Sequence, residues 1–238
     1  FSEHHLTPVE DIDGFVLKAA SPSCGLKDVK VYPATEKVPP IAKSSGFFGE
    51  QMLMRFPQVA VEDEGRLTNF RIREHFLTRL FLSARFRQVR ESNSMAKLVE
   101  FHSQNKYLLL TYNQKEMRIM GQIVANNPKR PVKEVINIYG DHLALAVSKI
   151  ARYRANINVL HHGMGYFSKN LTTREKKYFL DTIQQYEQEK IPLSVCQGIL
   201  KSWIIRFEQP YLMEQTYFNP FPEELIEITD SGKGRDRI

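Results

Sequence analysis

The stretch Gly14-Phe15-Val16-Leu17-Lys18-Ala19-Ala20-Ser21-Pro22-Ser23-Cys24-Gly25 decides how the first part of this chain folds. Its apolar residues 15–17 predict a buried strand, and residues 21–25 predict a tight turn directly after that strand. Open α/β sheets place their ligands at the carboxyl ends of their strands. A thiol beside two hydroxyls at such an edge suits a metal, a cluster or a nucleophile, although a lone cysteine is more often a buried structural thiol.

The composition describes an ordinary globular protein. Of 238 residues, 42% are hydrophobic and 25% are charged, which is enough to bury a core. No apolar run approaches the roughly 18 residues of a membrane helix, so we expect no membrane partner. Two cysteines cannot build a disulfide framework, so a reducing, cytoplasmic location is expected. Because the first residue is Phe1 and only twenty residues precede the turn, we expect the natural chain to start further upstream.

The positive charge is concentrated in one segment. Residues 1–65 hold 6 Lys and Arg against 10 Asp and Glu, residues 66–130 hold 13 against 4, and residues 131–238 hold 14 against 13. A local excess of this density is typical of a surface that binds a polyanion such as nucleic acid, and a solvated helix face is the alternative.

Residues 1–65 have the pattern of mixed structure. A second short strand is expected at 29–32, then a turn at 46–49 that opens a short helix at 50–54, which Pro57 ends, and a third strand at 59–61. The acidic turn at 62–66 follows, and the charge balance changes sign there. We therefore expect a domain boundary at 65/66, with domains over 1–65 and 66–238.

From about residue 69 the pattern is helical. Apolar residues recur at spacings of three and four between Phe70 and Ala84. Thr172 with Glu175 has the spacing of a capping box. Further helices are expected over 94–102, 107–112, 117–126, 132–152, 156–169, 173–188 and from 191 to 208. The expected fold class is therefore mixed: the C-terminal fragment of an α/β, Rossmann-like domain, followed by an all-α domain.

Several residues of the second domain are candidates for contact with RNA. They are basic residues and one aromatic ring on the expected helices: Arg71, Arg73, Arg85, Arg87, Arg90, His102, Lys106 and Tyr107. His102 and Lys106 are four residues apart and share a helix face, and aromatic rings interleaved with cations suit unpaired bases. The alternative for Tyr107 is a core position, since Leu108–Leu110 follow it.

Other site chemistry has little support. Neighbouring helical residues point about 100° apart, so His161 and His162 do not form a metal site by themselves. No P-loop, dinucleotide fingerprint, serine-triad order or multi-cysteine zinc spacing is present. Cys196 lies among apolar helical residues and is expected in the core.

Taken together, these residues resemble a known two-domain family. Residues 14–25, with Phe47-Phe48-Gly49 and residues 61–67, resemble the thiouracil desulfidase (TudS-type) domain. The second part is similar to the YbgA-like domain fused to it in RudS-type proteins. That similarity rests on short motifs in the helical part: residues 101–102, 106–109, 120–125, 158–162, 165–167, 191–193 and 215–217, with Pro220 and Pro222.

The resemblance implies an enzyme. Such proteins remove sulfur from thiolated uracil, free or as thiouridine in tRNA, and leave uracil or uridine and sulfide. They use a [4Fe-4S] cluster on three cysteines with one open iron. The resemblance implies that Cys24 is a cluster ligand and that either Ser21 or Ser23 supplies the catalytic hydroxyl. It also implies that the helical domain binds tRNA.

This chain departs from the family pattern. The two other cluster cysteines and a catalytic acidic residue belong to sequence that the chain lacks. We therefore expect the intact parent to be the desulfidase and the chain as given to be inactive. A non-catalytic tRNA-binding or nucleic-acid-binding module is the alternative function, and a helical protein-interaction domain is a third.

Overall fold

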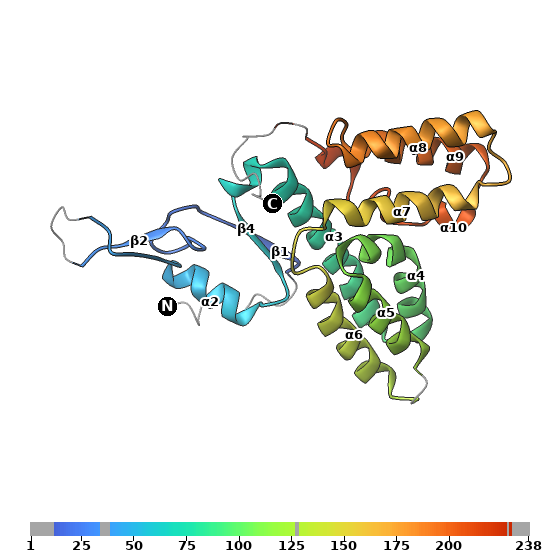
Figure 1. Ribbon diagram of the computed structural model, residues 1–238. Helices are drawn as coiled ribbons and strands as arrows, with labels where there is room; N and C mark the ends of the chain where they lie inside the picture. The colour runs from blue at the N-terminus through green and yellow to red at the C-terminus, as the bar shows by residue number, and fades with distance from the viewer. Residues whose placement is uncertain (1–11, 34–38, 127–128, 228, 230–238) are drawn as a thin grey trace. The chain divides into compact units, whose positions relative to one another are not determined.

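The computed structural model describes residues 12–33, 39–126, 129–227 and 229. These residues form two compact units (Figure 1). Unit 1 comprises residues 1–87 and 223–238, and unit 2 comprises residues 88–222. The parts of the expected first domain at 1–11 and 34–38 lie outside the described residues. The spatial division falls inside one long helix, whereas the change of charge lies at 65/66.

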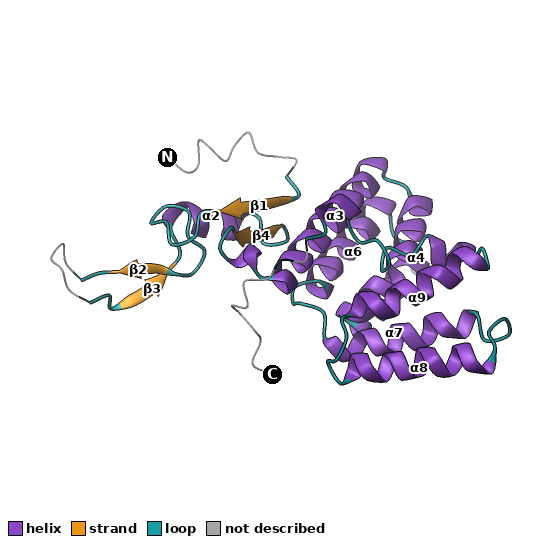
Figure 2. Ribbon diagram, turned by 90° about the horizontal axis from the view of Figure 1, so that it is seen from above, coloured by secondary structure: helices purple, strands orange, loops and turns teal. Residues whose placement is uncertain are grey.

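Unit 1 is built on short strands and one short helix (Figure 2). Strands β1 (Gly14–Leu17) and β4 (Ala60–Asp63) pair in parallel, with Gly14 opposite Ala60. Strands β2 (Val29–Val31) and β3 (Ala42–Ser44) form an antiparallel pair. Helix α2 (Phe47–Arg55) connects the two pairs in sequence. The three strands and the helix expected here are confirmed, but a Rossmann-like sheet is not: β1 and β4 are the only parallel strands among the described residues.

Helix α3 (Phe70–Ser92) covers the parallel pair of unit 1 with its first part. A Cβ atom built on Gly14 would lie 2.6 Å from the Leu80 side chain, so β1 approaches the helix closely only because residue 14 has no side chain. The Asn69 side chain accepts a hydrogen bond from the Ile72 amide at 3.1 Å, which caps the start of α3. The short helices η1 (Arg66–Thr68) and η2 (Glu223–Leu225) complete unit 1.

Unit 2 is all helical, as the sequence predicts. After the end of α3 its helices are α4 (Met95–Tyr112), α5 (Gln114–Ala125), α6 (Val132–Ala146), α7 (Tyr153–Tyr166), α8 (Thr173–Glu187), α9 (Leu193–Arg206) and α10 (Pro210–Met213). Helices α4, α5 and α6 pack on one another, α7, α8 and α9 do the same, and α4 also packs on α7 (Figure 1). The expected capping box is confirmed: the Thr172 and Glu175 side chains each bond the other residue's amide.

Several helix boundaries differ from the sequence prediction: α5 and α7 each begin three residues earlier than expected, and two larger differences occur in α4 and α6. The segments 94–102 and 107–112 form the single helix α4, because the polar residues between them contain no helix breaker. The segment 132–152 is helical only to Ala146. No glycine or proline stands at 147–152, so the periodic pattern alone does not mark that end.

The core of unit 2 contains large rings. Phe167, Phe179 and Trp203 are buried, with the Phe179 and Trp203 ring centroids 5.0 Å apart. Helices α7 and α9 approach at Gly163, where a Cβ atom would lie 2.9 Å from the Leu200 side chain. Cys196 is fully buried, as expected, and burial raises the pKa of its thiol to about 11.

Candidate functional site

The turn at 21–25 caps helix α2. The Ser23 carbonyl accepts hydrogen bonds from the amides of Phe48 and Gly49 at 2.8 and 3.1 Å, and the Pro22 carbonyl accepts one from Phe47. A Cβ atom on Gly46 would lie 2.4 Å from the Ser23 oxygen, so this contact requires glycine. The first amides of α2 are therefore bonded to the turn.

The side chains of the turn have different surroundings. The Ser21 hydroxyl oxygen accepts hydrogen bonds from the amides of Ser23 and Cys24 at 3.3 and 3.2 Å, so it holds the turn in shape. Ser23 is exposed, and Cys24 is half-buried. The structure thus brings the three predicted residues into one turn at the carboxyl end of β1, and gives Ser21 a structural contact that the sequence did not indicate.

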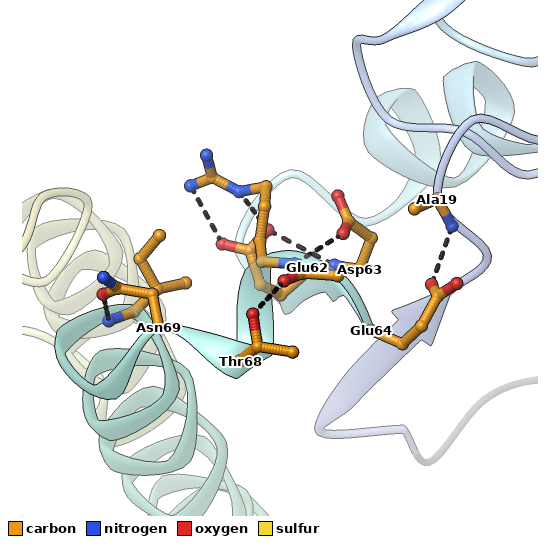
Figure 3. A network of polar contacts seen from close by, with 9 residues as sticks. Ala19, Glu62, Asp63, Glu64, Thr68 and Asn69 are labelled. Carbon is orange, nitrogen blue, oxygen red and sulfur yellow. Dashed lines mark hydrogen bonds and ion pairs between the residues drawn. The ribbon is translucent and has the colours of Figure 1, made fainter. Parts of the chain in front are cut away.

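Acidic residues at the end of β4 stabilise the same edge of the pair (Figure 3). Glu64 accepts a hydrogen bond from the Ala19 amide at 2.7 Å. It also accepts one from the Lys18 ammonium at 2.6 Å. The bond to Lys18 lowers the pKa of Glu64. Glu62 holds the Arg66 guanidinium with both carboxylate oxygens, and Asp63 accepts from the Arg66 amide. The acidic segment therefore closes the turn between β4 and α3.

The residues of this chain do not fit the [4Fe-4S] cluster that the resemblance implies. A cluster needs several thiolates, and the chain has two cysteines. Cys196 belongs to the core of unit 2, where its thiol contacts the Thr182 carbonyl at 3.9 Å. Among the described residues, no group of three His, Cys, Asp or Glu side chains is placed to hold a metal ion. No reaction step is therefore derived through a cluster.

Two of the predicted arginines of α3 make contacts inside unit 1. Arg73 donates to the carbonyls of Leu67 and Thr229 at 2.8 and 2.7 Å. Arg87 forms an ion pair with Asp13 at 2.9 Å, ahead of β1. Arg85 is largely buried, and burial lowers its pKa. Arg73 and Arg87 therefore stabilise unit 1, whereas Arg71 and Arg90 are exposed.

The predicted residues of α4 divide between surface and core. Lys106 is exposed. His102 is half-buried against α6, with its Nδ1 atom 3.1 Å from the Tyr139 hydroxyl. Burial lowers the pKa of His102, and the nearby Lys106 charge lowers it further. Tyr107 is only 6% exposed, which agrees with the core alternative.

Tyr107 belongs to an aromatic cluster that the sequence did not reveal. Its ring meets the Tyr211 ring edge to face at 6.2 Å, and the Tyr211 ring stacks on the Tyr166 ring at 5.8 Å. The three rings come from α4, α10 and α7. We call them the tyrosine cluster.

Gln215 and Thr216 hold the tyrosine cluster in place. The Gln215 side chain accepts from the Tyr107 amide at 3.1 Å and donates to the Ser103 carbonyl at 2.8 Å, so it bridges two α4 groups that pair with each other in a regular helix. The Thr216 hydroxyl donates to the buried Asn105 side chain at 2.7 Å. These bonds fix the segment that follows α10 against α4.

Helix α7 presents an exposed face that sequence reasoning also missed. Its exposed positions lie at helical spacing on one face: Arg154, Asn158, His161, His162, Gly165 and Tyr166. No acidic residue occurs between Asp141 and Glu175, a run of 33 residues. That run contains Lys149, Arg152, Arg154, Lys169 and Arg174. An acid-free run is visible in the sequence, so this signal was available. We call the exposed face of α7 the α7 face.

The helices of the described residues are too short or too polar to cross a membrane. The exposed positions of the α7 face include no acidic residue, and Tyr166 of the tyrosine cluster lies at the end of that helix.

Comparisons with known proteins match the helical part. Residues 106–222 match the family model described as a protein of unknown function (DUF1722). Over 163 residues the chain is 26% identical to the uncharacterized protein YbgA of Escherichia coli (strain K12), covering 68% of this chain and 86% of YbgA. No solved structure matches. These findings show that the chain is similar to YbgA and that its helical part is similar to this family. The family model does not include residues 14–25, so the desulfidase resemblance stays an expectation.

Proposed function

We propose that unit 2 binds RNA and that this RNA is a tRNA. The observation that carries this proposal is the α7 face, where each exposed side chain is neutral or basic along the whole helix. Binding to a phosphate backbone depends on cations and is opposed by carboxylates. A run of 33 residues without an acid keeps that opposing charge off the helix and its flanks.

The charge of the two units supports the same proposal. Residues 88–222 hold 18 Lys and Arg against 11 Asp and Glu, whereas the remaining residues hold 15 against 16. The positive charge of the protein thus belongs to the helical unit. From Arg154 to Tyr166 the α7 face extends about 18 Å at 1.5 Å per residue, which spans several phosphates of a nucleic-acid strand.

The test is the affinity of the full chain for an unmodified tRNA transcript, measured by anisotropy as a function of salt. We expect log K to fall with log[salt] with a slope of at least about 2, since several counterions are released. Arg154→Glu should lower affinity by about 10-fold or more. The matched control is Lys190→Glu, an equal charge change at an exposed position after α8, which should have an effect within about twofold.

Two outcomes would contradict the proposal. A slope near zero means that no phosphate is neutralised. Equal losses for Arg154→Glu and Lys190→Glu mean that only net charge matters, and that the α7 face is not the binding surface.

A second candidate is the desulfidation of thiolated uracil, either as a free base or within tRNA. One observation favours it: Cys24, half-buried, lies in the turn at the carboxyl end of β1, where α/β proteins bind their ligands. Both cysteines of the chain are free, which suits a reducing cytoplasm. Because one cysteine cannot hold a cluster, this candidate requires cysteines from outside the chain as given.

The test of this second candidate starts from protein purified without oxygen from its own source. Iron and acid-labile sulfide should accompany it, and it should convert thiouracil or a thiolated tRNA to the oxygen form. Cys24→Ser should abolish both, and Cys196→Ser should abolish neither. Native protein free of iron would contradict the candidate and would leave the RNA proposal standing.

A further inference from the structure

The tyrosine cluster places one aromatic ring at the surface of unit 2, and one side of this ring packs on a second ring of the cluster. Tyr166 is 44% exposed, although its ring stacks on Tyr211 with an interplanar angle of 15°. Tyr211 in turn meets the buried ring of Tyr107 nearly at a right angle, 89°. The layer therefore runs from the core outward and ends in an exposed ring.

The exposed ring is also fixed in orientation. The stack on Tyr211 sets the plane of the Tyr166 ring, and burial together with the neighbouring Tyr166 raises the pKa of the Tyr107 hydroxyl. Tyr166 is the last residue of α7, so the helix holds its backbone. A ring already held in one orientation loses little conformational freedom when a flat ligand stacks on it.

We propose that Tyr166 is a stacking platform for an unpaired nucleobase of the bound RNA. This inference rests on the proposed RNA binding and names the feature that the site recognises. Bases in single-stranded loops and ends stack on aromatic side chains, whereas bases inside a duplex are covered by their neighbours.

The polar side chains close to Tyr166 in the sequence fit a nucleotide. His162 lies four residues earlier on the same helix face, and Lys169 lies three residues later, both exposed. Lys106 is exposed next to Tyr107 on α4. The segment 142–174 around Tyr166 thus offers donors for the phosphates of a stacked base and contains no acidic residue, whereas Glu208 and Glu214 flank Tyr211 on the other side of the stack.

Tyr178 provides the matched control. It lies on α8, is 64% exposed, and has the acidic Asp181 three residues later, on the same side of the helix. Tyr178 thus offers an exposed ring of the same chemistry in a segment of the chain that contains acidic residues.

The experiment compares two RNAs of equal length, a single strand that carries one 2-aminopurine and a blunt duplex. Tyr166→Leu in the full chain should weaken binding of the single strand about 10-fold, within the range of one lost base stack, and leave duplex binding within about twofold. Tyr166→Phe keeps the ring and should stay within about threefold of the wild type. The wild type should quench 2-aminopurine fluorescence, and Tyr166→Leu should not.

The outcomes distinguish a failure of the stacking platform from a failure of the proposed RNA binding. If Tyr166→Leu and Tyr178→Leu have equal effects, or if both RNAs lose affinity equally, the platform is refuted while RNA binding stands. If the wild type binds neither RNA, both proposals fail. Trp203 fluorescence, which reports the fold of unit 2, must match the wild type in each variant, and Tyr166→Gln serves as the second variant without a ring if Tyr166→Leu does not match.

Discussion

Gln215→Leu tests the contact on which the tyrosine cluster depends. Gln215 is 2% exposed, and its amide bridges the Tyr107 N–H and the Ser103 carbonyl at 3.1 and 2.8 Å. Leucine has a similar volume and removes both hydrogen bonds. The substitution therefore changes hydrogen bonding more than packing.

The expected destabilisation is about 2–4 kcal/mol. Each lost hydrogen bond contributes about 0.5–1.5 kcal/mol, and a buried group left without any partner costs about 1–3 kcal/mol. Two lost hydrogen bonds and one unpaired group add up to a destabilisation of about 2–6 kcal/mol. The two α4 groups can still pair with each other as in a regular helix, so we expect the lower half of this range, about 2–4 kcal/mol.

The assay is urea unfolding followed by the fluorescence of Trp203, the single tryptophan of the chain, which lies buried in unit 2. The control is Gln122→Leu, the same change at an exposed position of α5, which should stay within about 0.5 kcal/mol. A loss below about 0.5 kcal/mol for Gln215→Leu would refute the reasoning. An undiminished affinity for single-stranded RNA in a destabilised variant would show that the bridge does not position the cluster.

Three further predictions concern the fold. Thr172→Ala removes the capping box of α8 and should cost about 1 kcal/mol in the same urea assay; no change in midpoint would contradict the cap. Gly163→Val places a side chain against Leu200 and should cost about 1–3 kcal/mol, and the double variant with Leu200→Ala should be less than additive. Burial, helped by the Arg79 charge, lowers the pKa of His75 to about 4, so its unfolded form takes up a proton first as the pH falls. The stability that this histidine contributes is therefore present above pH 6.5 and declines towards pH 4. In urea midpoints measured across this pH range, His75→Asn should make the decline shallower. A variant with the same pH profile as the wild type would refute this prediction.

Much of the fold could be predicted because its signals are local. Spacings of three and four residues mark α3, and Thr172 with Glu175 marks the start of α8 within a single turn. The strand and turn at 14–25 are predicted by residues that are neighbours in sequence. A periodic pattern does not reveal where a helix ends without a breaker, so the end of α6 at Ala146 was not predicted.

The candidate site was predicted less well, because charge in a sequence does not show which partner a side chain finds. Arg73 and Arg87 are residues of the type that RNA-binding surfaces use. In unit 1, however, Arg73 donates to a distant carbonyl and Arg87 pairs with Asp13. The acid-free run that includes the α7 face was also present in the sequence, because it is a local feature of the chain.

The sequence by itself determined the helical class of the second part, the concentration of positive charge there and the core position of Cys196. Only the tertiary structure decided that Tyr107, Tyr166 and Tyr211 meet. These residues are separated by 45 to 104 positions, and their rings come together because α4, α7 and α10 bury a common core. Local physics reaches about four residues along a helix, whereas contacts between helices depend on packing that no short segment contains.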